Sequence, residues 1–329
     1  MQGQGNVWAI VLAAGEGSRL RSLTTTREGV SIPKQFCSFG SGPSLLRQTI
    51  ERAGRIVPKE RIVTVVAAQH RQWWESELFD LPAENVVVQP QNRGTAPGIL
   101  LPVLHVIRRD PKATVLVFPS DHYIGDEETV LDCLRFSAAL AAGPQQPLVL
   151  LGITPDEPDP QYGWIVPARK NSSVPQAVEC FVEKPGESVA AKLMEEGALW
   201  SSFLFAASAR TLLKLFKRTL APLYHSFCLN PWSFGGEGAK EATPEWLLEE
   251  LYRAIPVADF SRDVLEKSKD DLLVFPVPVC DWSDLGTPAR IGSVFERRGT
   301  SGNPASHPFP RAVLDLCASL ASRGVAAAA

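Results

Sequence analysis

Short apolar runs alternate with amphipathic stretches along the first half of the chain. The runs that we expect to form buried strands are residues 7–12, 61–66, 86–89, 115–118 and 148–153. The stretches that we expect to form helices between them are residues 45–53, 70–79, 96–109 and 130–142. Strands that are apolar on both faces and alternate with helices are typical of a parallel sheet covered by helices on both sides. The pattern therefore predicts an α/β fold with right-handed crossovers.

The second half has a different sequence pattern, with a proline-rich loop after residue 154. Here we expect strands at 162–166, 177–183, 199–206 and 272–279, and helices at 188–196, 209–217 and 243–254. No flexible linker separates the two halves, so residues 1–297 are predicted to form one domain. A linker rich in Gly, Ser, Pro and Asn is expected at 298–311. We expect the short apolar helix after it, 312–322, to pack on the domain or on a second copy.

The composition is that of an ordinary globular protein, with 45% apolar and 21% charged residues. Thirty-three Lys and Arg residues against 36 Asp and Glu give a formal charge of −3, which argues against a nucleic-acid or membrane partner. The six cysteines form no C-x-x-C pair and the five histidines no H-E-x-x-H motif, so no structural zinc site is expected. The first apolar run, 7–14, is too short to span a membrane, and we expect a cytoplasmic protein.

A glycine-rich loop follows the first predicted strand, with Gly15 and Gly17 ahead of Arg19. Glycines at that place allow a sharp turn and let backbone N–H groups face an anion. The loop is not a Walker motif, because no Gly-Lys-Ser/Thr occurs, nor a dinucleotide-binding motif, because Leu20 replaces the third glycine. Arg19 and, further on, Lys34 add two cations, and cations with backbone donors suit a triphosphate. A plain strand-to-helix turn with a solvated arginine is the alternative.

Five short motifs lie in a fixed order along the chain. They are residues 12–20, Pro33-Lys34-Gln35, Phe118-Pro119-Ser120-Asp121-His122, Glu183-Lys184-Pro185 and Trp282-Ser283-Asp284-Leu285-Gly286. Together they resemble the sugar-1-phosphate nucleotidyltransferase family over about residues 6–297, and most closely its guanylyltransferases that act on mannose 1-phosphate.

That resemblance implies a Rossmann-like domain with a mostly parallel central sheet. It also implies a Mg²⁺-dependent reaction in which an NTP and a sugar 1-phosphate give an NDP-sugar and pyrophosphate. The nucleotide-binding half is expected at about 1–125 and the sugar-binding half at about 126–297.

Two aspartates stand in loops far apart in the chain. Asp121 follows a predicted strand, and Asp284 lies in a tight Asp-Leu-Gly turn. Mg²⁺ takes few carboxylates together with phosphate oxygens and water, so such a pair suits it, and the resemblance implies that these two residues hold the metal. For either aspartate alone, a helix cap or a turn explains the position equally well. We place Asp281 below Asp284 as a ligand, and His122 as a loop neighbour and not a base.

The resemblance also implies roles for three basic residues. Arg19 and the loop amides would hold the departing pyrophosphate, Lys34 would contact phosphate oxygens, and Lys184 would fix the sugar phosphate. With Asp121 they form the expected catalytic set. The sugar phosphate is already a nucleophile, so it attacks the α-phosphorus in line without a general base, and positioning and charge carry the rate. We expect Lys34→Ala to fold normally and to lose nearly all product formation.

The nucleotide is expected to lie on the glycine loop and on segment 89–97, which leads from a predicted strand into a helix. A glutamine amide has a donor and an acceptor, so Gln89 can read a base edge. Many guanine-specific relatives carry an acid there, although the segment as a whole favours guanosine. The residues expected to bind the nucleotide are Leu12, Ala13, Gly15, Gly17, Ser18, Gln89, Gly94, Thr95 and Ala96.

The sugar pocket departs from the family pattern. A Trp-Ser-Ser sequence replaces the usual Trp-Asn-Ser, and Phe203 stands where many relatives have glycine. Asp263 and Glu266 resemble another family segment beside the pocket, but a helix surface with alternating charge explains them equally well. The residues expected to bind the sugar are Tyr162, Gly163, Glu183, Ser201 and Ser202.

The resemblance therefore implies an enzyme that uses GTP and mannose 1-phosphate, with Mg²⁺ as cofactor. One alternative keeps the chemistry with another NTP or hexose 1-phosphate. An alternative of another class is a catalytically weak regulatory protein that binds nucleotide sugars, which Ser201 favours and the retained Asp121 and Asp284 oppose. A homodimer is open, and no nucleic-acid or membrane partner is expected.

Overall fold

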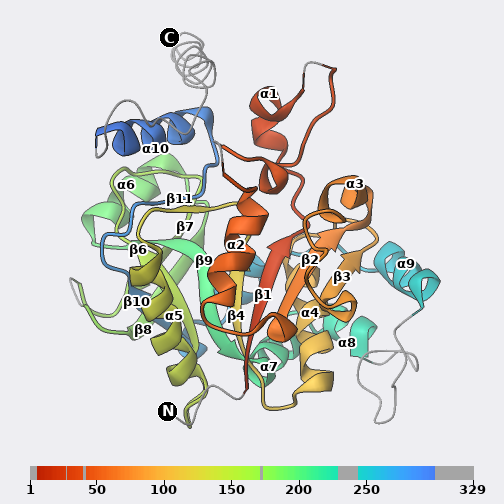
Figure 1. Ribbon diagram of the computed structural model, residues 1–329. Helices are drawn as coiled ribbons and strands as arrows, with labels where there is room; N and C mark the ends of the chain where they lie inside the picture. Colours follow the sequence, from red (N-terminus) through yellow and green to blue (C-terminus); the bar gives the residue numbers. More distant parts are fainter. Residues whose placement is uncertain (1–5, 27, 40–41, 171–172, 229–243, 301–329) are drawn as a thin grey trace.

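A nine-stranded mixed sheet forms the centre of the molecule (Figure 1). The computed structural model describes residues 6–26, 28–39, 42–170, 173–228 and 244–300. The strand order across the sheet is β3-β2-β1-β4-β9-β6-β10-β8-β7, and β5 pairs with β11 in a separate ladder. The strands are β1 (Val7–Ala13), β2 (Ile62–Ala67), β3 (Val86–Gln89), β4 (Thr114–Pro119), β5 (Tyr123–Ile124), β6 (Leu148–Ile153), β7 (Gly163–Pro167), β8 (Gln176–Glu183), β9 (Leu199–Ser208), β10 (Leu272–Pro276) and β11 (Trp282–Ser283).

All strands of the large sheet except β8 and β9 point the same way. β1 pairs in parallel with β2 and with β4, β2 with β3, and β6 with β10. β9 runs antiparallel between β4 and β6, and β8 runs antiparallel between β10 and β7. The predicted α/β fold with a mostly parallel sheet is confirmed. The apolar pattern did not reveal the two reversed strands, because a buried strand has the same pattern in both directions.

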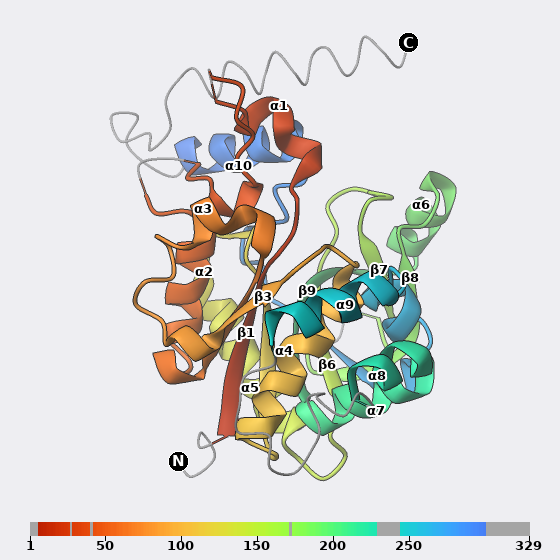
Figure 2. The same cartoon turned by 90° about the vertical axis from the view of Figure 1, so that its right-hand side faces the viewer.

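Helices cover both faces of the sheet, and Figure 2 shows α2 and α4 on opposite sides of β1. α4, α7 and α8 contribute to the core on one face, and α2, α5 and α6 to the core on the other. None of the described helices is both long and apolar enough for a membrane span. The helices are α1 (Arg21–Thr24), α2 (Leu45–Gly54), α3 (Arg71–Trp74), α4 (Thr95–Arg109), α5 (Glu127–Ala141), α6 (Glu187–Glu195), α7 (Ala209–Thr219), α8 (Ala221–Cys228), α9 (Glu245–Ala254) and α10 (Pro288–Thr300).

Local sequence signals set the central elements. Every residue of β2 and of β4 is buried, as their continuous apolar runs predict. Ser44 caps α2 by accepting a hydrogen bond from the Arg47 amide at 3.1 Å, and Asp126 caps α5 through the Thr129 amide at 3.2 Å. Such caps satisfy amide donors that the first helical turn leaves without partners.

Helix α3 is much shorter than the predicted helix 70–79. Arg47 of α2 donates to the Glu77 carbonyl at 3.3 Å and forms an ion pair with Asp80 at 2.5 Å. Residues 75–80 form turns, and the two Arg47 contacts hold this segment against α2. A tertiary contact therefore overrode the helical pattern.

The end of the domain differs from its prediction in two places. β10 ends at Pro276 and not at residue 279, because Pro276 and Pro278 lack the N–H that a strand ladder requires. Helix α10, which was not predicted, continues through Thr300 and so includes the first residues of the expected linker 298–311. The expected helix 312–322 lies outside the described residues.

Helix α10 closes the top of the molecule beside α1, as both ribbon views show. Its Ile291 and Val294 belong to a small apolar cluster with Leu20 and Leu285. Leu20 follows the glycine-rich loop and Leu285 lies next to Asp284, so α10 packs behind both segments.

Gly94 lies at the entrance of α4, where segment 89–97 meets the chain near Ala258. The Ala96 amide donates to the Ala258 carbonyl at 3.1 Å, and the Ala258 amide donates to the Arg93 carbonyl at 3.0 Å. Gly94 has a φ of +88°, and an added Cβ would lie 2.3 Å from the Ala258 carbonyl oxygen. The close approach of the two segments therefore requires glycine.

We predict that Gly94→Ala lowers the free energy of unfolding by about 2–5 kcal/mol, because the cost of a left-handed backbone adds to that of an overpacked contact. Gly29→Ala is the matched control, since Gly29 has a φ of +83° but nothing lies within 4 Å of an added Cβ. Its free energy of unfolding should fall only by the cost of a left-handed backbone, about 1–2 kcal/mol. Urea unfolding of both variants measures the difference, and equal losses would contradict the role given to the Ala258 contact.

Candidate active site

A cavity of about 420 Å³ opens at the carboxyl ends of β1, β3 and β4, where open α/β sheets bind ligands. Its wall combines the glycine-rich loop and segment 89–97 from the first half with loops from the second half. The predicted site residues that line it are Leu12, Gly15, Gly17, Arg19, Gln89, Gly94, Thr95, Asp121, Tyr162, Gly163, Glu183, Lys184, Ser201 and Asp284. The fold thus brings together residues that the sequence separates by more than half its length.

Four predicted site residues with described side chains do not line the cavity, namely Ala13, Lys34, Ala96 and Ser202. The Ser202 hydroxyl donates to the Leu151 carbonyl at 2.8 Å and is fully buried. The Ala13 carbonyl accepts from the Gln35 amide at 2.9 Å. The side chain of Ser18 lies outside the described part of the chain.

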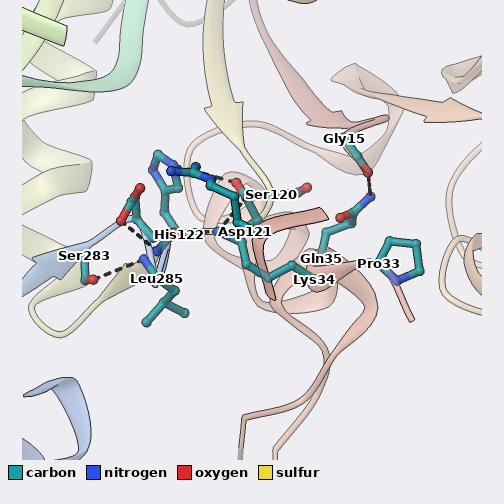
Figure 3. A network of polar contacts seen from close by, with 12 residues as sticks. Gly15, Pro33, Lys34, Gln35, Ser120, Asp121, His122, Ser283 and Leu285 are labelled. Atoms are coloured by element: carbon teal, nitrogen blue, oxygen red, sulfur yellow. Dashed lines mark hydrogen bonds and ion pairs between the residues drawn. The ribbon is translucent and has the colours of Figure 1, made fainter. Parts of the chain in front are cut away.

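Lys34 lies beneath the floor of the cavity, with 4% of its surface exposed. Its Nζ contacts Asp121 Oδ2 at 2.8 Å and donates to the Asp284 carbonyl oxygen at 2.5 Å. Figure 3 shows Lys34 running from its own loop to Asp121. Burial alone would raise the pKa of Asp121, but the charge of Lys34 and its hydrogen bond help to outweigh burial, so this pKa lies below its ordinary value. Asp121 is therefore an anion at neutral pH.

Asp284 has one carboxylate oxygen surrounded by donors. Its Oδ1 accepts from the Tyr162 hydroxyl at 2.9 Å, from the Gly286 amide at 2.8 Å and from Arg290 Nη1 at 2.8 Å. No described residue donates to Oδ2. Arg290 also forms an ion pair with Asp159, and its guanidinium lies 4.2 Å from the centre of the Tyr162 ring. Sequence reasoning missed Arg290, because nothing in its neighbourhood indicates a contact with Asp159.

The two aspartates fit a magnesium ion that shares its ligands with substrate phosphates. Mg²⁺ is usually bound in proteins by one or two carboxylates together with phosphate oxygens and water. Asp121 and Asp284 line the same cavity, and the Lys34 contacts hold them close together. Among the described residues no group of three His, Cys, Asp or Glu side chains forms an all-protein metal cage. Asp281 does not line the cavity and instead pairs with Arg297 at 2.7 Å.

The glycine-rich loop is held by Gln35, which also lines the cavity and to which the sequence assigned no role. Its Nε2 donates to the carbonyls of Ala13 and Gly15 at 2.9 and 2.8 Å, and the second contact is visible in Figure 3. Gly17 has a φ of +59°, and an added Cβ would lie 2.8 Å from the Lys34 amide nitrogen. The loop is thus packed tightly on the Lys34 segment, with its upper side toward the cavity.

Arg19 reaches across the cavity to the second half of the domain. Its Nη1 donates to the Gln161 side-chain oxygen at 2.9 Å, and both residues line the cavity. Gln161 is a further contact that the sequence did not indicate. An anion held by Arg19 would therefore lie between the two halves.

Glu183 and Lys184, which the resemblance assigns to the sugar phosphate, both line the cavity. Their side chains form an ion pair at 3.1 Å, and burial raises the pKa of Glu183. An added Cβ on Gly163 would lie 2.7 Å from Glu183 Oε2, so Gly163 leaves room for this carboxylate. The Glu183 amide donates to Glu266 at 2.6 Å. Glu266 thus fixes the backbone of the pocket without lining it.

The chain has a left-handed backbone at Phe203, with a φ of +58°. This is the position at which the family pattern favours glycine, and a bulky residue is unusual in that conformation. The ring packs at 6.2 Å against Phe205 and Phe260, which keeps the backbone in place. Ser201 lines the cavity and accepts from the Phe203 amide at 3.4 Å.

Asp259 is a cavity residue that the sequence did not reveal. Its carboxylate accepts from the Thr95 hydroxyl at 3.1 Å, and its amide donates to Asp263 at 2.8 Å. Asp263 does not line the cavity and also pairs with Lys267 at 3.4 Å. The alternating charges around Asp263 are therefore explained by a helix surface, on which Asp263 also accepts a hydrogen bond from the Asp259 amide.

The chain belongs to the Nucleotidyl transferase family, whose sequence profile matches residues 8–297. The resemblance drawn from the five motifs is therefore confirmed.

Two named relatives and one solved structure specify the relationship further. The chain is 32% identical over 299 residues to the xanthan biosynthesis protein XanB of Xanthomonas campestris pv. campestris (strain ATCC 33913), covering 89% of this chain and 60% of that protein. It is 30% identical over 300 residues to the mannose-1-phosphate guanylyltransferase ManC of Salmonella typhimurium (strain LT2), covering 86% and 58%. This chain thus spans about three fifths of the length of these relatives.

A crystal structure from Thermus thermophilus, described as a mannose-1-phosphate geranyltransferase, superposes with a TM-score of 0.73 at 28% identity. The match covers 92% of this chain and 81% of that one. A UDP-glucose pyrophosphorylase complexed with UDP-glucose shares the fold at 13% identity and a TM-score of 0.56.

We predict that Arg290→Met lowers the free energy of unfolding by about 3–5 kcal/mol, because Asp159 and Asp284 would stay buried without their cation. Lys192→Met is the control: it removes an exposed pair with Glu196 and should cost less than about 1 kcal/mol. Urea unfolding of both variants gives the comparison. Adding Asp159→Asn to Arg290→Met should recover part of the lost stability. An Arg290→Met variant as stable as the wild type would contradict this account.

Proposed function

We propose that this chain transfers a nucleotidyl group from an NTP to a sugar 1-phosphate, giving an NDP-sugar and pyrophosphate. The observation that carries the proposal is the pair Asp121 and Asp284, which come from distant segments and meet at one cavity over Lys34. The glycine-rich loop and Lys184 line the same cavity, so it offers donors for two phosphorylated substrates. Membership of the family supports this chemistry.

The reaction needs positioning and charge more than proton transfer. A sugar-phosphate oxygen attacks the α-phosphorus in line, its bond to phosphorus forms, and the bond to the departing pyrophosphate breaks on the opposite side. Arg19 and the amides of the glycine-rich loop hold the pyrophosphate, and Lys184 holds the sugar phosphate. Asp121 and Asp284 would hold Mg²⁺, which supplies positive charge for the phosphate oxygens.

Lys34 has a positioning role in this proposal. Its ammonium is already bound by Asp121 and by the Asp284 carbonyl, so it sets the two acidic loops at a fixed separation. The expectation that Lys34→Ala folds normally does not agree with this burial, because the Asp121 carboxylate would lose its partner. We therefore expect that variant to lose both stability and turnover.

GTP and mannose 1-phosphate are the proposed substrates, since relatives are named mannose-1-phosphate guanylyltransferases. Nucleic acid and membranes are not proposed as partners. Within the described residues the cysteines are free, which supports a reducing, cytoplasmic location. A homodimer stays a prediction.

A catalytically weak regulatory protein is the second candidate function. Ser201 in place of the family asparagine and the left-handed backbone of Phe203 favour it, because both alter the wall beside the sugar end. The preserved carboxylate pair favours the enzyme, since a protein that only binds nucleotide sugars does not need two metal ligands.

We predict that the purified chain releases pyrophosphate from GTP and mannose 1-phosphate with Mg²⁺, and that EDTA abolishes the release. Asp121→Asn and Asp284→Asn should each lower turnover by about 100-fold or more, because each removes charge from the metal site. A coupled pyrophosphate assay over four NTPs and several hexose 1-phosphates measures this.

Asp281→Asn is the matched control for these variants, since Asp281 lies three residues before Asp284 and outside the cavity. It should keep turnover near that of the wild type. A wild-type chain that binds a nucleotide sugar but releases no pyrophosphate with any substrate pair would support the regulatory candidate instead.

We predict that affinity for the sugar phosphate falls as the pH drops through the raised pKa of Glu183. Burial raises this pKa above the ordinary carboxyl value, and protonation turns one of the two accepting oxygens into a donor. The KM for mannose 1-phosphate should therefore rise toward acidic pH. In Glu183→Gln the part of this rise that comes from protonation of Glu183 should be absent. The substrate phosphate titrates near pH ~6 with either protein, so the difference between the profiles isolates Glu183.

Glu187→Gln, at the exposed first turn of α6, should keep the wild-type profile. Identical profiles for the wild type and Glu183→Gln would contradict the role of Glu183.

A further inference from the structure

Gln89 brings a side-chain amide to one end of the cavity. That end is walled by Leu12, Val65 and Gly98, and Asp121 and Asp284 line the same cavity. The amide lies directly over Gly98, since an added Cβ there would be 3.5 Å from Nε2 and 4.0 Å from Oε1 of Gln89. Apolar walls with one amide suit the flat face and polar edge of a nucleobase.

The inner side of this amide is bonded to Tyr252. Nε2 of Gln89 and the phenol oxygen are 3.0 Å apart, and the two residues are 3% and 0% exposed. Tyr252 is fixed in turn, because its carbonyl accepts from Arg93 Nε at 2.6 Å and its ring packs edge-on against Phe227 at 6.0 Å. Burial raises the pKa of Tyr252, so the phenol keeps its proton at neutral pH.

Both members of this pair can donate and accept. The amide donates through nitrogen and accepts through oxygen, and a neutral phenol does both. When the amide is turned by 180°, the phenol donates to Oε1 in place of accepting from Nε2. The internal hydrogen bond is kept in both orientations, so the group facing the cavity can be either a donor or an acceptor.

We propose that Gln89 and Tyr252 form an invertible base reader, and that the chain binds both guanosine and adenosine triphosphates. With Oε1 toward the cavity the pair accepts from the N1–H of guanine, and with Nε2 toward the cavity it donates to N1 of adenine. This inference rests on the proposed function and on the sequence-based expectation that the base lies at Gln89. A carboxylate at residue 89 accepts only, so it would select guanine and repel the lone pair of adenine N1.

The test is isothermal titration of GTP and ATP into the full chain with Mg²⁺ at pH ~8 and again at pH ~9, because burial raises the pKa of a glutamate introduced at residue 89. The wild type should bind GTP and ATP with dissociation constants within about tenfold of each other, because neither base leaves Gln89 or Tyr252 without a hydrogen-bond partner. Gln89→Glu should raise the preference for GTP by about 10- to 100-fold, mainly through loss of ATP affinity, because adenine then faces an unsatisfied carboxylate.

Gln161→Glu is the matched control. It makes the same change of charge in the same cavity, but next to Arg19 and away from Gln89. It should change the affinities for GTP and ATP by the same factor. Tyr252→Phe removes the phenol hydroxyl that both orientations of the amide use. It should therefore lower the affinities for GTP and ATP and leave the ratio of the two affinities as in the wild type.

The inference is overturned if the wild type prefers GTP by more than about 100-fold, if it binds neither nucleotide, or if Gln89→Glu leaves the ratio unchanged. Because the titration contains no sugar phosphate, it is independent of turnover. A chain that binds both nucleotides and releases no pyrophosphate would refute the proposed function and retain the base reader.

Discussion

One buried cation determines how the two acidic loops at the cavity are assembled. The Lys34 ammonium lies between the Asp121 carboxylate and the Asp284 carbonyl, which belongs to a residue 250 positions away. Two acidic loops drawn to one cavity would repel each other, and a compensating charge in a poorly solvated place weakens that repulsion strongly. Lys34 also follows the glycine-rich loop, and Gly17 packs against its backbone. A single residue thus relates the glycine-rich loop to both acidic loops.

The last described helix of the domain reinforces this assembly from the other side. Arg290 of α10 binds Asp284 and Asp159 together and covers the ring of Tyr162, whose hydroxyl also binds Asp284. Left-handed backbone conformations occur at Lys184, Phe203 and Leu285, near the same cavity. Non-glycine residues hold such conformations only when their surroundings fix them, so the dense network around the carboxylates and the strained loops support each other.

The two ends of the cavity differ in character from its centre. The centre holds full charges, each with several partners, and these partners leave little freedom for rotation. The end predicted to hold the base has the neutral amide of Gln89, and the end predicted to hold the sugar has Ser201. The family pattern has an acid and an asparagine at these positions. Neutral groups that both donate and accept adapt to more than one ligand edge. In this chain the charged groups at the centre of the cavity are therefore held by several contacts, while the neutral groups toward its ends can both donate and accept.

The sequence by itself determined the strands, the glycine-rich loop and the acidic motifs, because apolar runs, turn residues and motif spacing are local properties of the chain. The resemblance carried by those motifs indicated Asp121, Asp284, Glu183 and Gln89 as cavity residues. The burial of Lys34, the reversed strands β8 and β9, the short α3, and the partners Arg290, Tyr252, Gln35 and Asp259 were decided only by the tertiary structure. These features depend on contacts between segments that are distant in the chain, and no local pattern records which segment packs against which.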